Sequence, residues 1–397
     1  MSKDPVVIVS AARTPMGGMM GDLSSLSGPE LGGIAIKAAV ERAKIKPELI
    51  QEVIMGCILP AGTRQAPARQ AALNAGLAMS ATCTTINKAC GSGMKAAMFA
   101  NDLLSVGTND VMVAGGMESM SNAPYLVLKG RGGYRLGHSQ LIDHMFYDAL
   151  EDAYFPETKG RLMGTFAEDC AKMYEFTREE QDNFAITSTT RAQKAIEDGS
   201  FDWEVVPVAV SSRKGEILVK QDEQPPKAKL DKISSLKPAF SKDGTVTAAN
   251  SSSISDGAAA LVMMRRSVAE KLGLKPLATV VSHASNSMEP RYFPIAPIGA
   301  TKALLEKTGW STNDVDLWEI NEAFAVVTMA AMRDLKLDHE KVNIHGGACA
   351  LGHPVGASGA RIITTLLGAL RKTGGKRGVA AICIGGGEAT AIAVEME

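Results

Sequence analysis

The segments CGSGMK at residues 90–95 and VMVAGGMES at 111–119 decide the fold, because close counterparts of both follow near the end of the chain. There, GASGAR at 356–361 is followed by VAAICIGGGEA at 379–389. Each pair gives small residues and a basic residue at a helix start, then an apolar strand, a Gly-Gly pair and an acid. We interpret this echo as an internal duplication, in which two similar halves make up one chain.

Short apolar runs alternate with helical patterns around the first of these segments. Residues 6–9, 53–59 and 111–114 have the pattern of buried strands. Ser27 and Glu30 have the spacing of a capping box ahead of an apolar helical stripe. A second helix is expected from position 91 to about 107.

The last third of the chain repeats this alternation. Strands are expected at 278–282, 316–320 and 379–384, with a helix through 324–332. A further helix at 356–371 has an apolar face and ends before Gly374. Alternation of this kind predicts a layered α/β fold, and the many Gly, Ala and Met residues favour closely packed layers.

The middle of the chain breaks the pattern. Residues from about 122 to 253 contain RGGYRLG at 131–137, a polar stretch at 211–242 and one helical pattern at 177–198. We interpret this region as an insertion that covers a site or contacts a partner.

The composition is that of an ordinary globular chain. Of 397 residues, 45% are hydrophobic and 21% charged, and 42 Lys and Arg balance 43 Asp and Glu. A chain so close to neutral has no field that would attract nucleic acid or an anionic membrane. No apolar run reaches the ~18 residues that cross a bilayer. We therefore expect neither nucleic acid nor membrane as a partner.

Cysteine usage indicates a reducing compartment. No two cysteines have a CxxC or other zinc-like spacing. The beginning of the sequence, MSKDPVVIVSAARTP, lacks the apolar segment and cleavage site of a signal peptide. We therefore expect reduced thiols and a cytoplasmic location. The six cysteines are Cys57, Cys83, Cys90, Cys170, Cys349 and Cys383.

Four residues with useful chemistry stand where expected strands meet helices or loops. They are Cys90, Asn321, His353 and Cys383. Open α/β folds place their sites at such junctions. Cys90 precedes a Gly-rich helix start, whose N–H groups and dipole favour an anion and are expected to lower the thiol pKa. A Cys with a His is the minimum for an activated thiolate.

Other interpretations of these residues remain open at this point. A single Cys is often a small buried hydrophobe, and His353 could cap a backbone carbonyl in a loop. GSGMKA at 91–96 fits a dinucleotide pattern but does not follow the first strand. Cys349 and His353 could form a metal pair, although Leu351-Gly352 and Pro354 argue against a helix there, and we expect no metal.

The conjunction of motifs is far more specific than any one of them. NKACGSGMKA at 87–96, NEAFA at 321–325 and GGACALGHPVGASGAR at 346–361 stand in order with AGGMESMS and CIGGG. Together they resemble the thiolase family over the whole chain. The resemblance implies the thiolase fold, with two βαβαβαββ halves in five α-β-α-β-α layers. It implies halves at 1–123 plus 254–275 and at 276–397, with an inserted loop domain at 124–253.

The motifs are most similar to the biosynthetic, short-chain branch, with acetyl-CoA C-acetyltransferase activity. In that scheme, His353 takes the proton of Cys90, which accepts an acetyl group from acetyl-CoA. Cys383 then deprotonates a second acetyl-CoA, whose carbanion attacks acetyl-Cys90 and releases acetoacetyl-CoA. Asn321, through a water, and His353 would form one oxyanion hole. The N–H groups of Cys90 and Gly385 would form the other.

The resemblance also implies residues that contact the substrate. Ser252 would contact the pantetheine, and other residues would line its channel, face the acyl group or meet a CoA phosphate. The family's His-Met-Gly is Leu162-Met163-Gly164 in this chain, so one imidazole is missing. Phe293-Pro294 replaces a Met-Gly, as in mitochondrial members that process 2-methylacetoacetyl-CoA, and suggests tolerance of that branch. The candidate contact residues are Ser252, Met163, Ala323, Phe324, Phe293 and Lys227.

The expected partners are CoA thioesters, which are substrates, and further copies of the chain. No separate cofactor is expected. The segment at 131–140 lies where short-chain members place a tetramer-forming loop, which favours a homotetramer built as a dimer of dimers. Two alternatives are a 3-ketoacyl-CoA thiolase for longer chains and a non-catalytic CoA-thioester-binding protein of the same fold.

Overall fold

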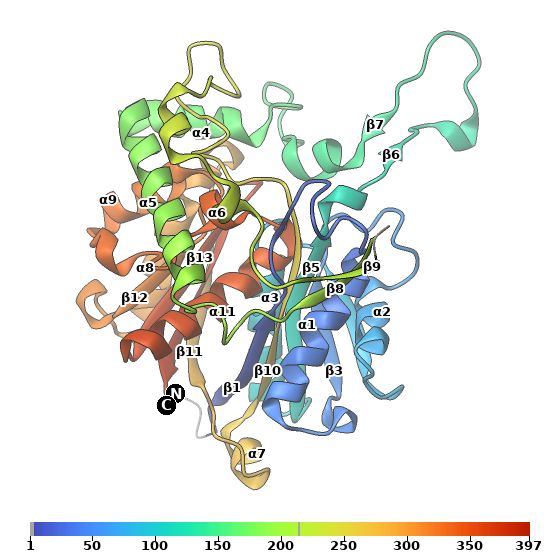
Figure 1. The fold of residues 1–397 in the computed structure, drawn as a ribbon, viewed down its shortest axis with the longest axis vertical. Helices are drawn as coiled ribbons and strands as arrows, with labels where there is room; N and C mark the ends of the chain where they lie inside the picture. Colours follow the sequence, from blue (N-terminus) through green and yellow to red (C-terminus); the bar gives the residue numbers. More distant parts are fainter. Residues whose placement is uncertain (1–3, 213–214) are drawn as a thin grey trace.

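The strands and helices follow the alternation expected from the sequence (Figure 1). The computed structural model describes residues 4–212 and 215–397. The strands are β1 (Val6–Arg13), β2 (Gly17–Gly18), β3 (Glu52–Gly56), β4 (Thr82–Ile86), β5 (Val111–Ser119), β6 (Tyr125–Leu126), β7 (Ile142–Asp143), β8 (Val208–Ser212), β9 (Gly215–Val219), β10 (Ser255–Arg265), β11 (Ala278–Ser287), β12 (Leu317–Ile320), β13 (Arg377–Ile384) and β14 (Glu388–Met396). The helices are α1 (Gly28–Ala43), α2 (Pro67–Asn74), α3 (Ser92–Ser105), α4 (Met163–Met173), α5 (Arg178–Glu197), α6 (Gln224–Lys227), α7 (Arg266–Lys271), α8 (Ala296–Thr308), α9 (Ala325–Leu335), α10 (Ala348–Leu351) and α11 (Val355–Thr373).

The main sheet has two halves with the same strand order. The first half runs β4-β3-β5-β10-β1 and the second β12-β13-β14-β11. The halves are continuous because β1 and β11 pair through Val7 with Thr279 and Ile8 with Ala278. The matching order is what an internal duplication requires, and it agrees with the expected thiolase fold.

The second half differs from the expected βαβαβαββ pattern at its third strand. The counterpart of β4 is reduced to an isolated parallel bridge between Trp318 and Val342. Immediately afterwards Asn343 has a φ of 48° and Gly346 a φ of 75°. Such left-handed conformations turn an extended chain away from a sheet. The duplication is therefore complete in order but shortened by one strand.

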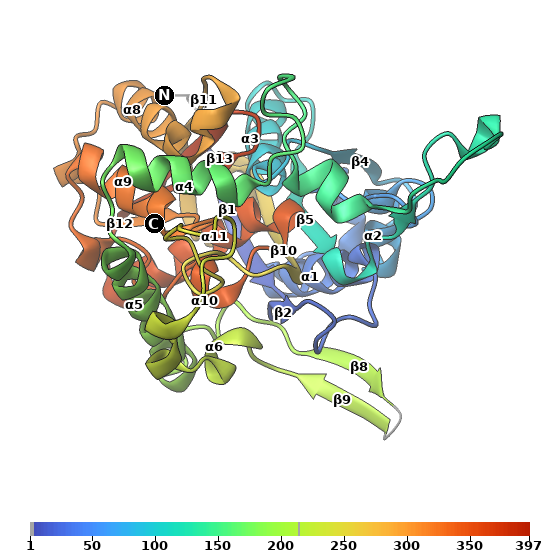
Figure 2. The same ribbon diagram turned by 90° about the horizontal axis from the view of Figure 1, so that it is seen from above.

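Three buried apolar clusters hold five layers of helices and strands together. One cluster packs α1 and α2 against the first half of the sheet, and another packs α8 against the second half. The cluster between them joins side chains of α3 and α11 with inward-facing residues of both halves. Figure 2 shows α3 and α11 near the centre, with α8 and α9 toward one side and α1 and α2 toward the other. The order of layers is α-β-α-β-α, as predicted.

Glycines let the two central helices touch through their backbones. A Cβ added at Gly359 of α11 would lie 2.3 Å from the backbone nitrogen of Met94 on α3. One added at Gly93 would lie 2.7 Å from the nitrogen of Ala360. Real Cβ atoms do not approach backbone atoms so closely, so a side chain at either position would push the helices apart. These glycines lie near the starts of the two helices, and their lack of side chains lets the two halves of the molecule come together there.

The region between β5 and β10 lies mostly over the strand ends (Figure 1). Its helix α5 has a capping box at Thr177 and matches the expected pattern, whereas α4 was not expected. Residues 125–143 form an arm that projects from the body. Leu136, in the segment between β6 and β7, is fully exposed. Within residues 4–212 and 215–397, no helix has the length and apolar character to span a membrane.

Candidate active site

Cys90 sits at a strained turn between β4 and α3. Ala89 just before it has a φ of 41°, a left-handed conformation that costs a non-glycine residue ~1–2 kcal/mol. The Ser92 hydroxyl holds this turn, since it donates to the Ala89 carbonyl at 2.7 Å and accepts the Lys88 N–H at 2.8 Å. The turn places Cys90 just before the first residue of the central helix α3.

The electrostatics of Cys90 correct one expectation. Backbone N–H groups of Gly385 and of Cys90 itself donate toward the sulfur, as a helix start should. Burial nevertheless outweighs them and raises the pKa of Cys90 to about 11. The prediction of a lowered thiol pKa was therefore wrong for the resting protein. Cys90 rests as a thiol and needs a base to ionise it.

His353 is prepared to be that base. Its Nδ1 lies 2.5 Å from the Ser358 hydroxyl, which donates its own proton to the Pro354 carbonyl at 3.0 Å. Since that hydroxyl can only accept from the ring, Nδ1 carries the proton and Nε2 a free lone pair. Nε2 is buried and has no hydrogen-bond partner among the described residues. Burial, aided by Arg361, lowers the pKa of His353 to about 3, so the ring is neutral.

Cys383 lies beside Cys90, on the other half of the molecule. It is fully buried near the end of β13, and a negative charge on Cys90 disfavours its ionisation. Burial, together with that charge, raises the pKa of Cys383 well above its ordinary value. The three predicted residues Cys90, Cys383 and Gly385 thus come together although they lie in opposite halves of the chain.

Glycine is favoured after Cys383 for two different reasons, a left-handed backbone and the space left by a missing side chain. Gly386 and Gly387 have φ values of 97° and 81°, which favour glycine. A Cβ at Gly386 would also lie 2.4 Å from the Tyr154 hydroxyl. A Cβ at Gly385 would meet only Met163 Sδ at 3.5 Å, an ordinary contact. Space therefore remains around the Gly385 N–H, with Met163 as the side chain nearest to it.

Asn321 follows β12 and is held from two directions. Its backbone N–H donates to Ala381 of β13 at 3.0 Å, and its side-chain oxygen accepts from Arg361 Nη2 at 3.4 Å. Its Nδ2 is buried and has no partner among the described residues. The next residue, Glu322, accepts from Ser188 and Asn343 and fixes the backbone of Cys349.

Cys349 and His353 do not share a helix. The short helix α10 contains Cys349, so the expectation of no helix there was wrong for 348–351. The helix ends before Gly352, whose φ is 98°, and His353 lies beyond it. Within residues 4–212 and 215–397, no group of three His, Cys, Asp or Glu side chains could hold a metal ion.

Phe293, predicted beside the acyl group, and the predicted channel residues Met163, Ala323 and Phe324 belong to or pack against one apolar cluster with Cys383. Phe293 is buried and packs edge-on against Phe166 and Phe324, at ring distances of 6.3 and 6.5 Å. The Ser252 hydroxyl donates to the Ala323 carbonyl at 2.9 Å. Leu162, which replaces the family's His, immediately precedes α4. Cluster members and packed neighbours include Met163, Phe166, Phe293, Ala323, Phe324 and Cys383.

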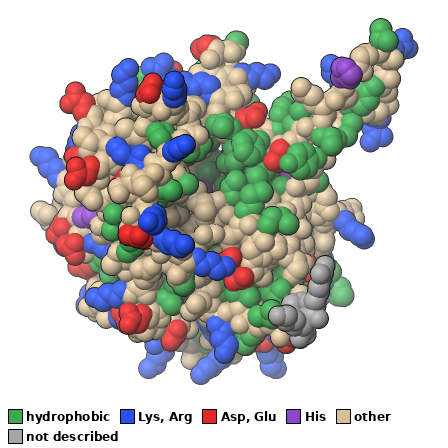
Figure 3. All heavy atoms as spheres, turned by 45° about the horizontal axis from the view of Figure 1, so that its top comes forward, with side chains coloured by type: hydrophobic (Ala, Val, Ile, Leu, Met, Phe, Trp, Pro, Cys, Tyr) green, Lys and Arg blue, Asp and Glu red, His purple; other side chains and the backbone are tan. Residues whose placement is uncertain are grey.

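A cavity of about 290 Å³ is lined in part by Ser253, the neighbour of Ser252 in the chain, and by Cys349. The Ser253 carbonyl accepts the backbone N–H of His353 at 3.1 Å. Three lysines, Lys227, Lys229 and Lys232, line another part of it. Lys227 also forms an ion pair with Glu223 at 2.6 Å. Figure 3 shows a hollow on the molecular surface between an apolar area at the arm's base and a group of Lys and Arg side chains.

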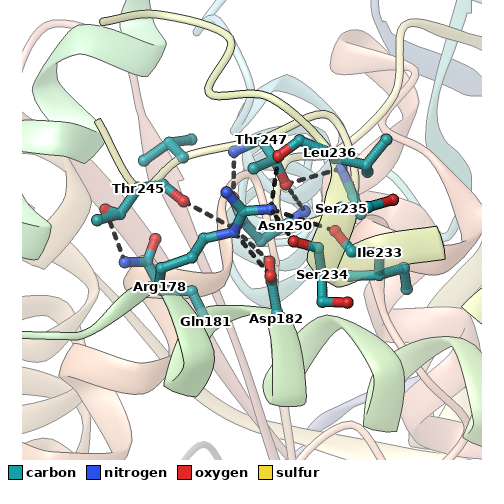
Figure 4. Close-up of polar contacts among 12 residues, drawn as sticks. Arg178, Gln181, Asp182, Ile233, Ser234, Ser235, Leu236, Thr245, Thr247 and Asn250 are labelled. Atoms are coloured by element: carbon teal, nitrogen blue, oxygen red, sulfur yellow. Dashed lines mark hydrogen bonds and ion pairs between the residues drawn. The ribbon is translucent and has the colours of Figure 1, made fainter. Parts of the chain in front are cut away.

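A partly buried polar cluster, which sequence reasoning missed, fixes one wall of the cavity (Figure 4). Arg178 of α5 donates through Nη2 to the carbonyls of Ile233, Ser234 and Leu236, at 3.2, 3.4 and 2.8 Å. Asp182 accepts from Arg178 Nε at 2.7 Å and from Asn250 at 3.1 Å. The loop that supplies cavity residues 233 and 236 is thereby fastened to a long helix.

Three further buried residues were also missed. Ser358 orients His353, and Arg361 orients Asn321. Glu118 accepts the N–H groups of Ile58, Leu59 and Gly356, tying three segments around Cys90. A sequence signal existed for two of them, because Ser358 and Arg361 stand in the GASGAR echo opposite Ser92 and Lys95.

Family models cover nearly all of this chain. The thiolase N-terminal domain matches residues 6–267, and the thiolase C-terminal domain matches residues 274–396. The chain belongs to the thiolase family.

Individual relatives resemble this thiolase over their full length. The acetyl-CoA acetyltransferase of Cupriavidus necator is 49% identical over 392 residues, which are 98% of this chain and 99% of the relative. The mitochondrial acetyl-CoA acetyltransferase B of Xenopus laevis is 50% identical, over 98% of this chain and 91% of its own. The Acat5 thiolase of Ascaris suum, solved in complex with coenzyme A, has a TM-score of 0.92 at 44% identity. That comparison covers 99% of this chain and all of the other.

Proposed function

We propose that this thiolase is an acetyl-CoA C-acetyltransferase, which joins two acetyl-CoA into acetoacetyl-CoA and CoA and catalyses the reverse thiolysis. The observation that carries the proposal is the placement of two thiols, Cys90 and Cys383, side by side under the Gly385 N–H. The curated relatives with this activity support it. Since the equilibrium of such a condensation favours thiolysis, the net direction depends on what consumes acetoacetyl-CoA.

The first step acetylates Cys90. His353 Nε2 takes the thiol proton, and the sulfur attacks the carbonyl carbon of acetyl-CoA. The N–H groups of Cys90 and Gly385 already point at this sulfur, so they lie within reach of the oxyanion that forms on it. The C–S bond to CoA then breaks. The CoA sulfur takes a proton from Cys383, which is left as a thiolate.

The second step forms the new carbon–carbon bond. The Cys383 thiolate removes a proton from the methyl group of a second acetyl-CoA. Acetylation has by then neutralised Cys90, which removes the charge that opposes a thiolate at Cys383. The enolate oxygen is stabilised by protonated His353 and by a water on the free Asn321 Nδ2. The carbanion attacks acetyl-Cys90, acetoacetyl-CoA leaves, and His353 returns its proton to Cys90.

The cavity beside Ser253 is the proposed binding site for CoA. Its lysines carry the charge that phosphates need, and its lining residue Ser253 is hydrogen-bonded to the backbone of His353. The Ascaris suum neighbour, solved with coenzyme A, supports CoA as the ligand. Lys229 and Lys232 join Lys227 as candidate phosphate contacts, while Ser252, Met163, Ala323 and Phe324 lie toward the reacting end.

Labelling with acetyl-CoA tests the assignment of roles. After digestion, mass spectrometry should find the acetyl group on Cys90. The Cys383→Ala variant should still become acetylated but condense more than ~10²-fold more slowly. The Cys90→Ala variant should do neither. A label on Cys57 or Cys83 with Cys90 unmodified would refute the mechanism, as would condensation by Cys383→Ala at near the wild-type rate.

Phe293, Phe166 and Phe324 crowd the acyl side and favour short substrates. A series of 3-ketoacyl-CoA substrates should show kcat/KM falling steeply beyond acetoacetyl-CoA, whereas a flat series would favour the longer-chain alternative. A 2-methyl branch should be accepted, with a penalty well below ~10³-fold. A non-catalytic binding protein would turn over none of these substrates.

We also propose that the chain assembles as a dimer of dimers. β4 is an unpaired edge of the main sheet, and such edges recruit a second strand. The arm exposes apolar side chains, with Leu141 68% and Tyr125 64% exposed alongside Leu136. Light scattering after gel filtration should give a tetramer for the wild type and a dimer for Leu136→Asp with Leu141→Asp. A wild-type dimer would refute this assembly.

We propose that the chain is divided into three parts, two similar halves and an inserted loop domain. β10 pairs with β1 and β5, which supports placing 254–275 with 1–123. The part at 124–253 carries α4, α5 and the arm, and 276–397 carries the second half of the sheet. Limited proteolysis should cut first within 124–253.

The proposed location is the cytoplasm. All six cysteines are free thiols, which suits a reducing compartment. Some relatives are named as mitochondrial enzymes, so fractionation of cells that express the chain should compare the two compartments. Enrichment in mitochondria would overturn the cytoplasmic assignment.

A further inference from the structure

Arg361 is a charged residue in the interior of the molecule that the mechanism does not use directly. It lies on α11, between the two halves of the sheet, and is completely buried. Its Nη1 forms an ion pair with Glu319 of β12 at 3.6 Å. Neither Nη1 nor Nε has a hydrogen-bond partner among the described residues. A buried guanidinium so incompletely paired is costly to keep, which calls for a functional reason.

Its one hydrogen bond to a residue of the site goes to Asn321. Arg361 Nη2 donates to the Asn321 Oδ1 at 3.4 Å. A guanidinium has only donors, so the side of the amide that faces it must be the oxygen. The NH₂ group must then face the opposite way, where Nδ2 has no partner among the described residues. Arg361 therefore settles which end of the amide is presented to the site.

Without this hydrogen bond, the Asn321 side-chain amide could flip about its Cβ–Cγ bond, exchanging its oxygen and nitrogen, at little cost in free energy. The rotated amide would present an oxygen where the enolate needs a donor, and two facing acceptors repel each other. The ion pair with Glu319 and the packing of α11 hold the guanidinium in place. Glu319 and Asn321 lie close together at the end of β12, so one arginine fixes the strand end and the amide.

We propose that Arg361 is a positioning residue, which acts in the condensation step by holding the Asn321 amide with its NH₂ group toward the substrate enolate. The inference rests on the proposed function and adds a residue to it. The oxyanion of the acetylation step faces the N–H groups of Cys90 and Gly385, so the positioning role belongs to condensation alone. Arg361 acts on acetylation only through its charge, which helps lower the pKa of His353.

A double-mutant cycle tests the proposal. Arg361→Met, Asn321→Ala and the double variant are compared with the wild type in two assays, acetylation of Cys90 and condensation. Arg361→Met should slow condensation at least about 30-fold and acetylation less than about 3-fold. In the Asn321→Ala background, the same replacement should slow condensation less than about 3-fold, because the amide it positions is absent.

A purely structural role would give a different result. The Arg361 replacement would then slow condensation by the same factor in both backgrounds, or slow both half-reactions alike, and either outcome overturns the proposal. If Arg361→Met does not fold, the cycle is run with Arg361→Lys, which keeps a positive charge opposite Glu319. A wild-type chain that forms no acetyl-Cys90 would refute the proposed function, and this inference with it.

Discussion

At the scale of single residues, the site depends on the protonation states that its side chains have before substrate binds. Cys90 and Cys383 rest as thiols because burial raises the pKa of both. His353 rests neutral, with Nδ1–H donated to Ser358 and Nε2 free. In the proposed mechanism, Cys90 and His353 therefore begin uncharged and become an ion pair only as the sulfur attacks. This timing spares the site a buried charge in the resting enzyme.

Removing the Ser358 hydroxyl should expose the importance of this tautomer. We expect Ser358→Ala to slow the acetylation of Cys90 roughly 10- to 100-fold, a part of what a general base contributes. Single-turnover mixing with acetyl-CoA measures the rate. Thr364→Val is the matched control, because Thr364 makes the same kind of hydrogen bond to Ala360 on the same buried helix. Equal slowing in both variants would show that helix stability, not ring orientation, is responsible.

At the scale of elements, the duplication gives each half one member of the reacting pair. Ser92 on α3 holds the turn of Cys90, and its counterpart Ser358 on α11 holds the ring of His353. In the proposed mechanism, the same position thus supports the nucleophile in one half and the base in the other. The two helices lie close together near their starts, where a Cβ at Gly93 or Gly359 would meet the backbone of the facing helix.

The contact between these helices should tolerate no side chain. Gly359→Ala places a Cβ 2.3 Å from the Met94 nitrogen, a backbone atom that cannot move alone. We expect the free energy of unfolding to fall by ~2 kcal/mol or more. Gly28→Ala, at the start of α1, meets nothing closer than 3.6 Å and should change it by less than ~1 kcal/mol. Urea unfolding compares the two. Similar losses would mean that the helices do not meet this closely.

The wall of the proposed CoA cavity makes a separate prediction about affinity. Arg178→Met releases the carbonyls of Ile233 and Leu236, so the loop has to be ordered by the ligand instead. We expect KM for acetyl-CoA to rise about 10-fold, with kcat changed less than about 3-fold.

Arg191→Met is the matched control for this loop. Arg191 lies on the same helix α5 and also donates to backbone carbonyls, but to those of His339 and Val342, away from the cavity. Steady-state kinetics of both variants decide the matter. An unchanged KM in Arg178→Met would separate the loop from CoA binding, and a lowered kcat alone would assign it a different role.

The layers and the helix ends were predictable from the sequence, whereas the buried charges were not. The apolar stripe before Gly374 gave the end of α11, whose next residue has a φ of 73°. The helix α4 was missed because no side chain caps its start, although its buried residues Phe166, Ala167, Cys170 and Ala171 have helical spacing. Arg361 and Glu118 looked like ordinary charged residues, because a sequence does not show that both partners of a buried contact will be brought inside.

At the scale of the whole molecule, neither half contains a complete site. The first half supplies Cys90, and the second supplies Asn321, His353, Cys383 and Gly385. The proximity of Cys90 to Gly385 depends on the pairing of β1 with β11 and on the packing of α3 against α11. Activity should therefore be lost as soon as the halves separate, before either half unfolds on its own.

The packing of the halves onto the insertion should also make the molecule sensitive to acid. His345 is buried beside Phe201, with a ring distance of 5.7 Å, and burial lowers its pKa from 6.5 to about 4. Between these values the unfolded chain binds a proton at this position and the folded chain does not. Stability contributed at His345 is thus present above pH 6.5 and is lost as the pH falls toward 4.

Replacing His345 with an uncharged residue should remove this part of the acid sensitivity. The free energy of unfolding of His345→Gln should run parallel to that of the wild type above about pH 7. At about pH 4.5 the free energy of unfolding of the wild type should have fallen further than that of His345→Gln, by as much as roughly 3 kcal/mol. Other buried groups, including His353 and Glu118, are present in both chains and cancel in the difference. Urea unfolding at several pH values measures both curves. Curves that stay parallel down to about pH 4.5 would mean that His345 takes up its proton without unfolding and lies closer to solvent than its packing against Phe201 implies.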